Sequence, residues 1–226
     1  MEVIYEDNHI IIVNKAPGEI VQGDKTGDSP LVDTVKQWLK VKYNKPGNVF
    51  CGVTHRIDRP TSGLVVFAKT GKALSRMNDM FRRGDVHKTY WAIVANRPPQ
   101  PQTTLTHFLK AVEKNNKTYV ASPSDRDAKK AVLEYRLIAE SERYFLLEIN
   151  LLTGRKHQIR AQLAAIGCPI KGDLKYGAPR SNPDGSISLQ SHRIWFTHPV
   201  SHEVVDVTAP PLHDSLWQAL CQAAQQ

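Results

Sequence analysis

Apolar residues recur along the chain with two periods, and the shorter period predicts a protein built mainly from strands. Alternating or continuous apolar runs predict strands at 3–5, 9–14, 63–68 and 86–95. Beyond a proline-rich stretch, further strands are predicted at 103–109, 118–121, 131–138, 144–151, 187–196 and 203–207. Because sheet–helix–sheet crossovers are few, the pattern predicts an α+β fold with a mixed, mainly antiparallel central sheet flanked by helices.

The longer period predicts helices that carry terminal signals. One should begin after Ser29 and Pro30, a capping hydroxyl followed by proline at the first helical position. A second is capped by Thr70 and ended by Gly84. Two more are predicted at about 156–166 and 214–223.

The domain organisation follows from the chain length and from one rigid segment. A chain of 226 residues is long enough to bury a large core, and it shows no internal repeat. The segment 97–101, Arg-Pro-Pro-Gln-Pro, is a stiff connector. We expect residues 1–226 to form a single domain, with two halves of one sheet on either side of this connector.

The charge of the chain indicates a polyanionic partner. The chain carries 30 basic and 22 acidic residues, a formal charge of +8. Basic residues concentrate in 69–88, 110–130 and 155–180, whereas only Arg193 is basic beyond residue 180. A surface of this kind attracts phosphate backbones. On charge alone, a solvated basic face without a partner remains the alternative.

Other features of the composition indicate a soluble cytoplasmic protein. The three cysteines lie far apart without paired spacing, which fits neither a disulfide framework nor a zinc knuckle. No apolar run reaches membrane-spanning length, and the acidic start lacks a secretory or transit pattern. His198 and His202 have ligand-like spacing, but Pro199 prevents a shared helix. We therefore expect no metal site.

The segment 55–72 carries the first candidate for chemistry. Asp58 stands between Arg56 and Arg59, just before a Pro-Thr-Ser-Gly turn. Nearby positive charge favours the ionised carboxylate, which suits a nucleophile or a base better than a proton donor. The arginines suit phosphate binding. The alternative is structural, because Asp58 can also cap the turn through the backbone amides that follow it.

The segment 151–160 carries the second candidate, since it runs from a predicted strand into a predicted helix. Free amides at the helix start, beside Arg155 and Lys156, make an anion site. Arg160 should lie one turn inside the helix, opposite its apolar face, and point away from the core towards a cleft. His157 precedes it by three residues, so the two side chains should converge on one site. An ordinary surface arginine is the alternative.

The third candidate is an aromatic pair on a predicted strand. Tyr90 and Trp91 are neighbours, so they face opposite sides of the sheet. One ring can pack in the core while the other stays available for stacking. Most strand tyrosines are simply half-buried, so the pair alone is a weak signal.

Together, these segments resemble the signature motifs of the RluA-type RNA pseudouridine synthases. Residues 55–64, His-Arg-Ile-Asp-Arg-Pro-Thr-Ser-Gly-Leu, look like the segment that carries the catalytic Asp. Residues 88–90, Lys-Thr-Tyr, look like the segment whose Tyr lies against the target uracil. Residues 153–160, followed by Gly172-Asp173 and Tyr176, resemble the third motif, whose final Arg is expected to pair with the catalytic Asp. The resemblance runs from about residue 3 to residue 212.

Some positions depart from the family pattern. Pro17 comes one place later than in the usual Lys-Pro-x-Gly, Ile57 replaces the commoner Leu, and Gln190 stands where many relatives carry His. The chain also lacks the S4-like N-terminal module of many relatives, so it resembles the short subtype. None of these departures touches the candidate catalytic residues, but they put local RNA contacts in question.

The resemblance implies a pseudouridine synthase fold with a catalytic cleft across the sheet. It also implies an isomerase that cleaves the uridine N1–C1′ bond, turns the base and rejoins it through C5, without a cofactor. Asp58, Tyr90 and Arg160 would be the catalytic set, with Asp58 either attacking C1′ or removing the C2′ proton. Arg56 would insert into the stack that the flipped base leaves. Further RNA-binding residues are expected among His55, Arg59, Thr61, Lys69, Arg155, Lys156 and His157.

The implied partner is a tRNA or rRNA stem-loop with a flippable uridine, bound by a monomer. Two other classes of function stay open. One is a non-catalytic RNA-binding protein on the same fold. The other is a phosphate-ester hydrolase that uses the basic pocket and a divalent metal. Neither explains why an Asp, a Tyr and an Arg of these three motifs occur together.

Overall fold

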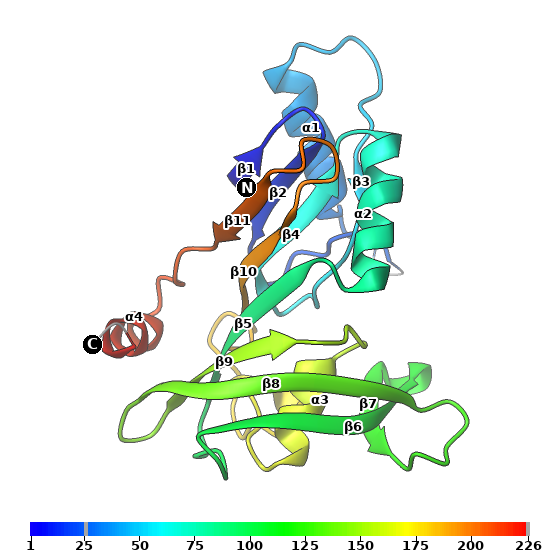
Figure 1. Ribbon diagram of the computed structural model, residues 1–226. Coiled ribbons are helices and arrows are strands. Elements are labelled where there is room, and N and C mark those ends of the chain that lie inside the picture. The colour runs from blue at the N-terminus through cyan, green and yellow to red at the C-terminus, as the bar shows by residue number, and fades with distance from the viewer. Residues whose placement is uncertain (25–26, 225–226) are drawn as a thin grey trace. The chain divides into compact units, whose positions relative to one another are not determined.

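The computed structural model describes residues 1–24 and 27–224 (Figure 1). The chain divides into two compact units, each made of two separate stretches. The first unit contains residues 1–87 and 191–209, and the second contains residues 88–190 and the chain from 210 onward. The predicted connector at 97–101 lies inside the second unit. Among the described residues, no helix is both long and apolar enough to cross a membrane.

The first unit is a sheet with two helices. Its strands are β1 (Glu2–Glu6), β2 (Ile10–Lys15), β3 (Gly52–Val53), β4 (Ser62–Ala68), most of β10 (Leu189–Thr197) and β11 (Val204–Thr208). Their order is β1-β2-β4-β10, with β3 paired to β4 and β11 to β10. The helices are α1 (Leu31–Lys42) and α2 (Gly71–Arg83).

The core of the first unit explains its uniformly apolar strands. All seven residues of β4 are buried, as are the first four of β2. One face of these strands packs against Ala73, Met77 and Met80 of α2. As predicted, Thr70 caps α2 by accepting a hydrogen bond from the backbone N–H of Ala73, and Gly84 ends it with a φ of 85°.

The predicted cap of α1 is wrong. The helix begins at Leu31 after Pro30, with no side-chain cap. Its first amides are instead satisfied by another segment, since Leu31 N donates to the Ile20 carbonyl (2.7 Å) and Val32 N to the Val21 carbonyl (3.2 Å). A hydroxyl cap is unnecessary where a neighbouring backbone already accepts these hydrogen bonds.

The second unit is a long, curved antiparallel sheet. Its strands are β5 (His87–Val94), which starts at the last residue of the first unit, β6 (Gln102–Val112), β7 (Lys117–Ala121), β8 (Lys129–Glu140) and β9 (Phe145–Leu151). Their order is β5-β9-β8-β6-β7, and every pair is antiparallel. The helical elements are α3 (Gln158–Ala165), α4 (Ser215–Ala223) and the 3₁₀ turns η1 (Glu113–Asn115) and η2 (Leu174–Tyr176).

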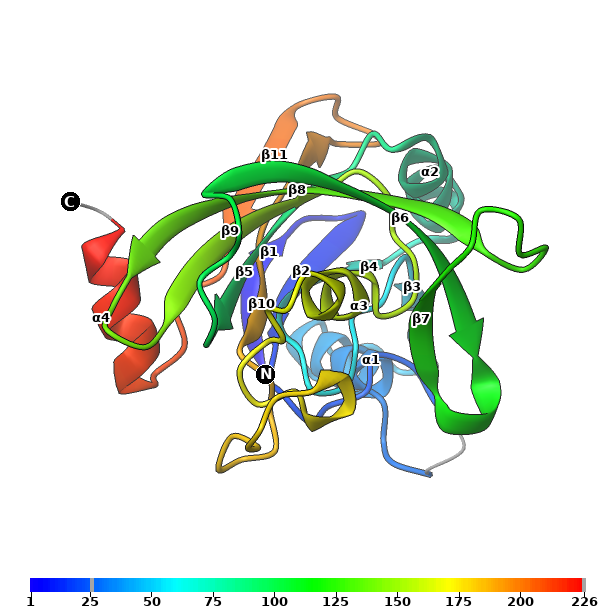
Figure 2. The same cartoon turned by 90° about the horizontal axis from the view of Figure 1, so that it is seen from below.

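Helices cover the two faces of this second sheet. Figure 2 shows α3 along the concave side of β6, β8 and β9, and α4 beside the far ends of β8 and β9. On the α3 side, Gln162 donates to the carbonyls of Leu105 and Ala131. On the other side, Trp217 and Leu220 of α4 pack with Ile93 of β5. The predicted α+β class with a mainly antiparallel sheet is confirmed.

Candidate active site

Asp58 lies in a tight turn between β3 and β4, in the first unit. The turn closes with a hydrogen bond from the backbone N–H of Thr61 to the main-chain carbonyl of Asp58 (3.0 Å). The bond that closes the turn therefore uses the backbone of Asp58 and does not require its carboxylate.

Gly63 fixes the path of the chain directly after this turn. Its φ is 107°, and a Cβ at this position would lie 2.3 Å from the carbonyl oxygen of Ser191 on β10. Only glycine adopts this backbone conformation readily and permits so close an approach. The start of β4 is thereby held against β10, four to five residues after Asp58.

Lys15 holds the turn from the other side, and sequence reasoning missed it. This residue ends β2 and is only 1 % exposed. Its ammonium donates to the carbonyls of Ala16 (2.8 Å), Glu19 (2.9 Å) and Arg59 (3.1 Å). The Arg59 carbonyl also accepts from Gly18 N (2.8 Å). The residue that follows Asp58 is therefore fixed at its backbone by two donors.

The electrostatics link Lys15 to Asp58. Burial lowers the pKa of Lys15 to about 8, and the positive charge of Arg59 adds to this decrease. The negative charges of Glu19 and Asp58 act in the opposite direction and favour the ammonium form. The candidate carboxylate thus lies within electrostatic range of a buried cation. The available signal in the sequence was a charged residue closing an otherwise apolar strand.

Two of the other candidates in the first unit present charge at the surface. Arg56 is exposed, as expected for a residue that contacts RNA. Arg59 is exposed and forms an ion pair with Asp28 (Nη2–Oδ2, 2.7 Å). This ion pair gives the arginine side chain a local partner, which the sequence did not predict.

The other three candidates of this unit are held by the fold. The His55 ring lies against Phe81, and its Nε2 accepts from Val66 N (3.0 Å). Thr61 is buried, and its Oγ1 has no hydrogen-bond partner among the described residues. Lys69 donates to the Glu6 carboxylate and to a main-chain carbonyl, both at 2.5 Å, and its side chain is only 9 % exposed. This geometry gives Lys69 a structural role.

Tyr90 and Trp91 face opposite sides of the second sheet, as predicted. Tyr90 is buried and pairs across the sheet with Ile149 of β9. Trp91 pairs with Glu148 and packs with the residues that contact α4. By strand alternation, Tyr90 lies on the face that α3 covers. The tyrosine and the 153–160 segment therefore share one side of this sheet.

The predicted anion site before α3 is altered by a side chain of the helix itself. The helix begins at Gln158, two residues later than expected, and His157 precedes it with a φ of 51°. The side-chain Oε1 of Gln158 accepts from Arg155 N (3.0 Å) and from Thr153 Oγ1 (2.8 Å). Arg155 also donates from Nε to the carbonyl of Lys130 (3.1 Å). The Arg155 amide is therefore already bonded, while the Arg155 and Lys156 side chains remain exposed.

Arg160 does not point outward, which corrects the expectation from helical spacing. It is buried and forms a two-point ion pair with Asp173, with Nε–Oδ2 at 2.7 Å and Nη2–Oδ1 at 2.8 Å. The ring of Tyr176 lies against its guanidinium at 4.9 Å. His157 Nδ1 lies 2.9 Å from the Tyr176 hydroxyl, so the His157 and Arg160 side chains both contact Tyr176.

The aromatic segment meets the third motif within the second unit. A Cβ on Gly154 would lie 3.7 Å from the ammonium of Lys88, two residues before Tyr90. Burial lowers the pKa of this lysine. The second unit thus brings the 88–90 and 153–160 segments together. Asp58 belongs to the first unit.

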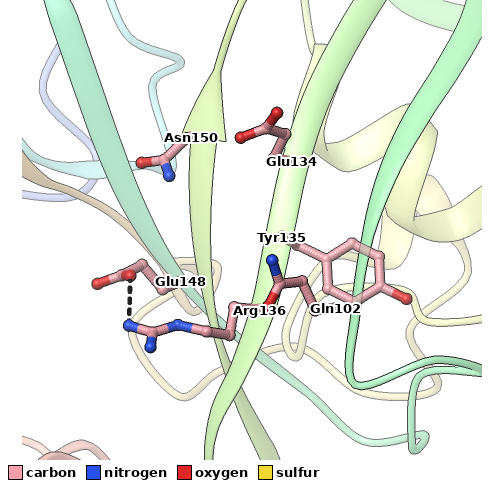
Figure 3. Close-up of a pocket in the computed structure, with 6 residues that line it drawn as sticks. All are labelled: Gln102, Glu134, Tyr135, Arg136, Glu148 and Asn150. Atoms are coloured by element: carbon pink, nitrogen blue, oxygen red, sulfur yellow. Dashed lines mark hydrogen bonds and ion pairs between the residues drawn. The ribbon is translucent and has the colours of Figure 1, made fainter.

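The second sheet also bears a shallow hollow, which contrasts with a site for a polyanion. Its volume is about 300 Å³, and its lining comes from β6, β8 and β9 (Figure 3). Glu134 and Glu148 contribute carboxylates there, and Glu148 forms an ion pair with Arg136 (3.0 Å). The close-up shows the Tyr135 ring turned away from the other labelled side chains. Since the two acids oppose phosphate binding, this hollow is a poor candidate for an RNA contact.

No metal centre emerges from the geometry. In residues 1–24 and 27–224, no group of three or more His, Cys, Asp or Glu side chains is placed to hold an ion. His198 instead organises a turn, because its Nδ1 accepts from the amides of Val200 and Ser201. Its Nε2 lies 2.9 Å from an oxygen of Asp7.

Comparisons with known proteins agree with this arrangement. The family model described as RNA pseudouridylate synthase matches residues 9–165. The tRNA pseudouridine synthase C of Vibrio parahaemolyticus is 32% identical over 97% of this chain and 93% of its own length. The ribosomal large subunit pseudouridine synthase D of Zymomonas mobilis is 31% identical over 92% of this chain, which spans 68% of that relative.

A likeness of fold accompanies the likeness of sequence. The structure of human RNA Pseudouridylate Synthase Domain Containing 4 superposes with a TM-score of 0.80 at 22% identity, covering 99% of this chain and 93% of the human one. With the family match spanning Asp58, Tyr90 and Arg160, the chain belongs to the RluA-type family of RNA pseudouridine synthases, which are isomerases acting on RNA.

Proposed function

We propose that this protein converts specific uridines of tRNA or rRNA to pseudouridine, with Asp58, Tyr90 and Arg160 as its catalytic residues. One observation carries the proposal. The segment matched by the family model, 9–165, contains all three residues in the expected motifs. The relative that corresponds over nearly its whole length is named for tRNA, which favours tRNA as the first substrate to test.

The chemistry requires the target base to leave its stack. Extruding a nucleotide from a duplex costs a few kcal/mol, because its stacking is lost. A side chain that fills the vacated space offsets part of this cost. Arg56 is exposed and stands two residues before Asp58. Its planar cation is suited to fill the space left by the base, because it can stack between the neighbouring bases. Tyr90 would support the extruded uracil by stacking.

Asp58 would start the exchange of the glycosidic bond from N1 to C5, either by attacking C1′ or by removing the C2′ proton. An ionised carboxylate serves either route. Arg160 would pair with Asp58 and keep it charged and aligned until the base arrives. Lys15 and Gly63 would hold the Asp58 turn, since they fix the backbone on both sides of it.

RNA binding would draw on the exposed basic residues. Arg56, Arg155 and Lys156 are exposed and suited to phosphates, with a binding constant that falls steeply with salt. We propose the cytoplasm as the location and a monomer as the active form. The non-catalytic alternative predicts that Asp58→Ala leaves every RNA-linked effect intact and removes no modification.

The direct test is tritium release from [5-³H]-uridine RNA, using total tRNA and rRNA as separate substrates without added metal. The wild type should release tritium, and Asp58→Asn should release none while retaining RNA binding. No release by the wild type from any host RNA contradicts the proposed activity. A requirement for a divalent metal with release of phosphate would favour the hydrolase instead.

Arg160 offers a second test of the same site. Replacing it with Met should abolish turnover and leave RNA affinity nearly unchanged, because the charge is needed at the reacting carboxylate. Measurement of kcat and KM for the two proteins separates these effects. A near-normal rate for Arg160→Met would contradict the proposed pairing with Asp58.

A further inference from the structure

The guanidinium of Arg160 is held along one edge and on one face. Asp173 occupies the edge through two short bonds, at 2.7 and 2.8 Å. The Tyr176 ring lies against the guanidinium, 4.9 Å from its centre. All three residues are more than nine-tenths buried. These contacts fix the plane of the guanidinium and its rotation within that plane.

Burial of this ion pair is not explained by stability alone. A buried pair loses hydration on both sides, and well-packed apolar residues of similar volume are often as stable. What a two-point Arg–carboxylate contact supplies is geometry, because the planar fork fits a carboxylate in one orientation. Since Nε and Nη2 are committed to Asp173, the direction of the remaining nitrogen, Nη1, is set by this contact.

The same group of contacts extends to the tip of the β6–β7 hairpin. The Tyr176 hydroxyl accepts from Thr118 N of β7 (2.8 Å) and meets His157 Nδ1. One residue earlier, Lys175 donates to the carbonyl of Asn116 at the hairpin tip (3.0 Å). The segment 173–176 therefore connects Arg160 to the hairpin through both side-chain and main-chain groups.

We infer that Asp173 and Tyr176 are positioning residues that aim the Arg160 guanidinium for the reaction, a role that rests on the proposed function. They act through Arg160 and touch no reacting atom. Pre-set geometry lowers the barrier to the chemical step without strengthening substrate binding. Their loss should therefore lower kcat and leave KM for RNA nearly constant.

Asp173 separates the effect of charge from the effect of position. Asp173→Asn removes the charge but keeps the shape, whereas Asp173→Glu keeps the charge and displaces it by one methylene. Each should lower kcat by about 10–100-fold, the range expected for a misplacement near 1 Å. Asp184→Asn is the matched control, because the Asp184 carboxylate accepts hydrogen bonds from Ser186 N and Oγ, away from Arg160, and its loss should leave kcat unchanged.

A double-mutant comparison distinguishes positioning from general structural support. In the Arg160→Lys background, which keeps the charge and a measurable rate, Asp173→Asn should cause little further loss of rate, because a lysine cannot form the two-point contact through which Asp173 acts. A further loss equal to that seen in the wild type would overturn the inference. So would a wild-type kcat for Asp173→Asn.

A second readout is independent of catalysis and of whether the Asp173 variants fold. The Arg160 Nε–H should give a slowly exchanging ¹⁵N–¹H NMR signal in the wild type, assigned by its loss in Arg160→Met. It should persist in Asp184→Asn. An Arg160 Nε–H that exchanges as fast as those of exposed arginines would overturn the inference. A protected signal in a protein without activity on RNA would instead contradict only the proposed function.

Discussion

Two buried cations, one in each unit, support the two segments that carry the candidate catalytic residues, and they are stabilised in different ways. Lys15 is bound by three main-chain carbonyls beside the Asp58 turn, and no carboxylate of residues 1–24 and 27–224 forms an ion pair with it. Arg160 is bound by the carboxylate of Asp173. The first arrangement leaves a buried positive charge incompletely compensated, whereas the second neutralises it.

The difference determines how each segment responds to pH. Carbonyl dipoles stabilise an ammonium less than a full negative charge does, so burial lowers the pKa of Lys15 to about 8. An arginine stays protonated in any protein environment. The Asp58 segment is therefore supported by a group that titrates near physiological pH, and the Arg160 segment by one that does not.

The largest effect should come from breaking the neutralised pair. Asp173→Ala leaves the buried Arg160 without its carboxylate and should lower the free energy of unfolding by about 3–5 kcal/mol. Urea denaturation followed by circular dichroism measures this. A loss below about 1 kcal/mol would show that water reaches the guanidinium once the carboxylate is gone, and that the pair is not buried in the folded protein.

The next largest effect should come from the titration of the buried Lys15. The unfolded state binds more protons than the folded state between pH 8 and 10.5, because the pKa of Lys15 is about 8 when folded and 10.5 when unfolded. Stability from this group therefore rises with pH across that window. Relative to Lys15→Met, the wild type should gain about 2 kcal/mol between pH 7.5 and 10.

The quantity to measure is the difference in unfolding free energy between the wild type and Lys15→Met as a function of pH. Burial also raises the pKa of Cys51 to about 12, which lowers the stability of both proteins above pH 9 and cancels in the difference. Lys40→Met is the control, because Lys40 lies exposed on α1. A Lys15→Met difference that is as flat as that of the control would refute the titration of a buried lysine.

A smaller effect should follow from loosening the link to the hairpin. Tyr176→Phe keeps the ring against Arg160 but leaves the buried amide of Thr118 without its acceptor. The expected loss is about 1–2 kcal/mol of unfolding free energy. Tyr119→Phe provides the control on the same hairpin, since its hydroxyl bonds to Asn115 at the exposed surface. Equal losses for both variants would remove the distinction.

The smallest effect should come from a solvent-exposed ion pair with the same geometry as the Arg160–Asp173 pair. Arg193 and Asp206 form a two-point contact like that of Arg160 and Asp173, with bonds of 2.8 and 2.5 Å, but both side chains are 40–47% exposed. Asp206→Ala should cost less than about 1 kcal/mol. A cost close to that of Asp173→Ala would mean that contact geometry, rather than burial, sets the strength of both pairs.

Much of the fold could be predicted because local periodicity and terminal signals agree with it. The apolar runs at 9–14 and 63–68 became buried strands, and Thr70 and Gly84 bound α2 as expected. The start of α1 could not be predicted from Ser29, since the partner of its amides comes from residues about ten positions earlier. Such a long-range backbone acceptor leaves no mark in the local sequence.

The site was predictable in its residue types but less so in its contacts. The turn at Asp58 follows from the local sequence. The burial of Arg160 does not, because its partner Asp173 lies thirteen positions away, beyond the helix. Lys15 was also missed as a site residue. A lysine at the end of an apolar strand is usually solvated, and only the loop folded over it reveals its burial.

The division of each unit into two stretches has a consequence for synthesis on the ribosome. β4 acquires its β10 neighbour only after residues 88–190 have been made, about a hundred residues later. At 5–20 residues per second this takes about 5–20 s. During that interval the nascent chain holds an apolar strand with much of one edge unpaired, since β3 covers only Phe67 and Ala68. Such an edge is a target for chaperones and for misassembly. Synonymous codon changes that slow translation after residue 87 should therefore lower the yield of folded protein without changing its final stability.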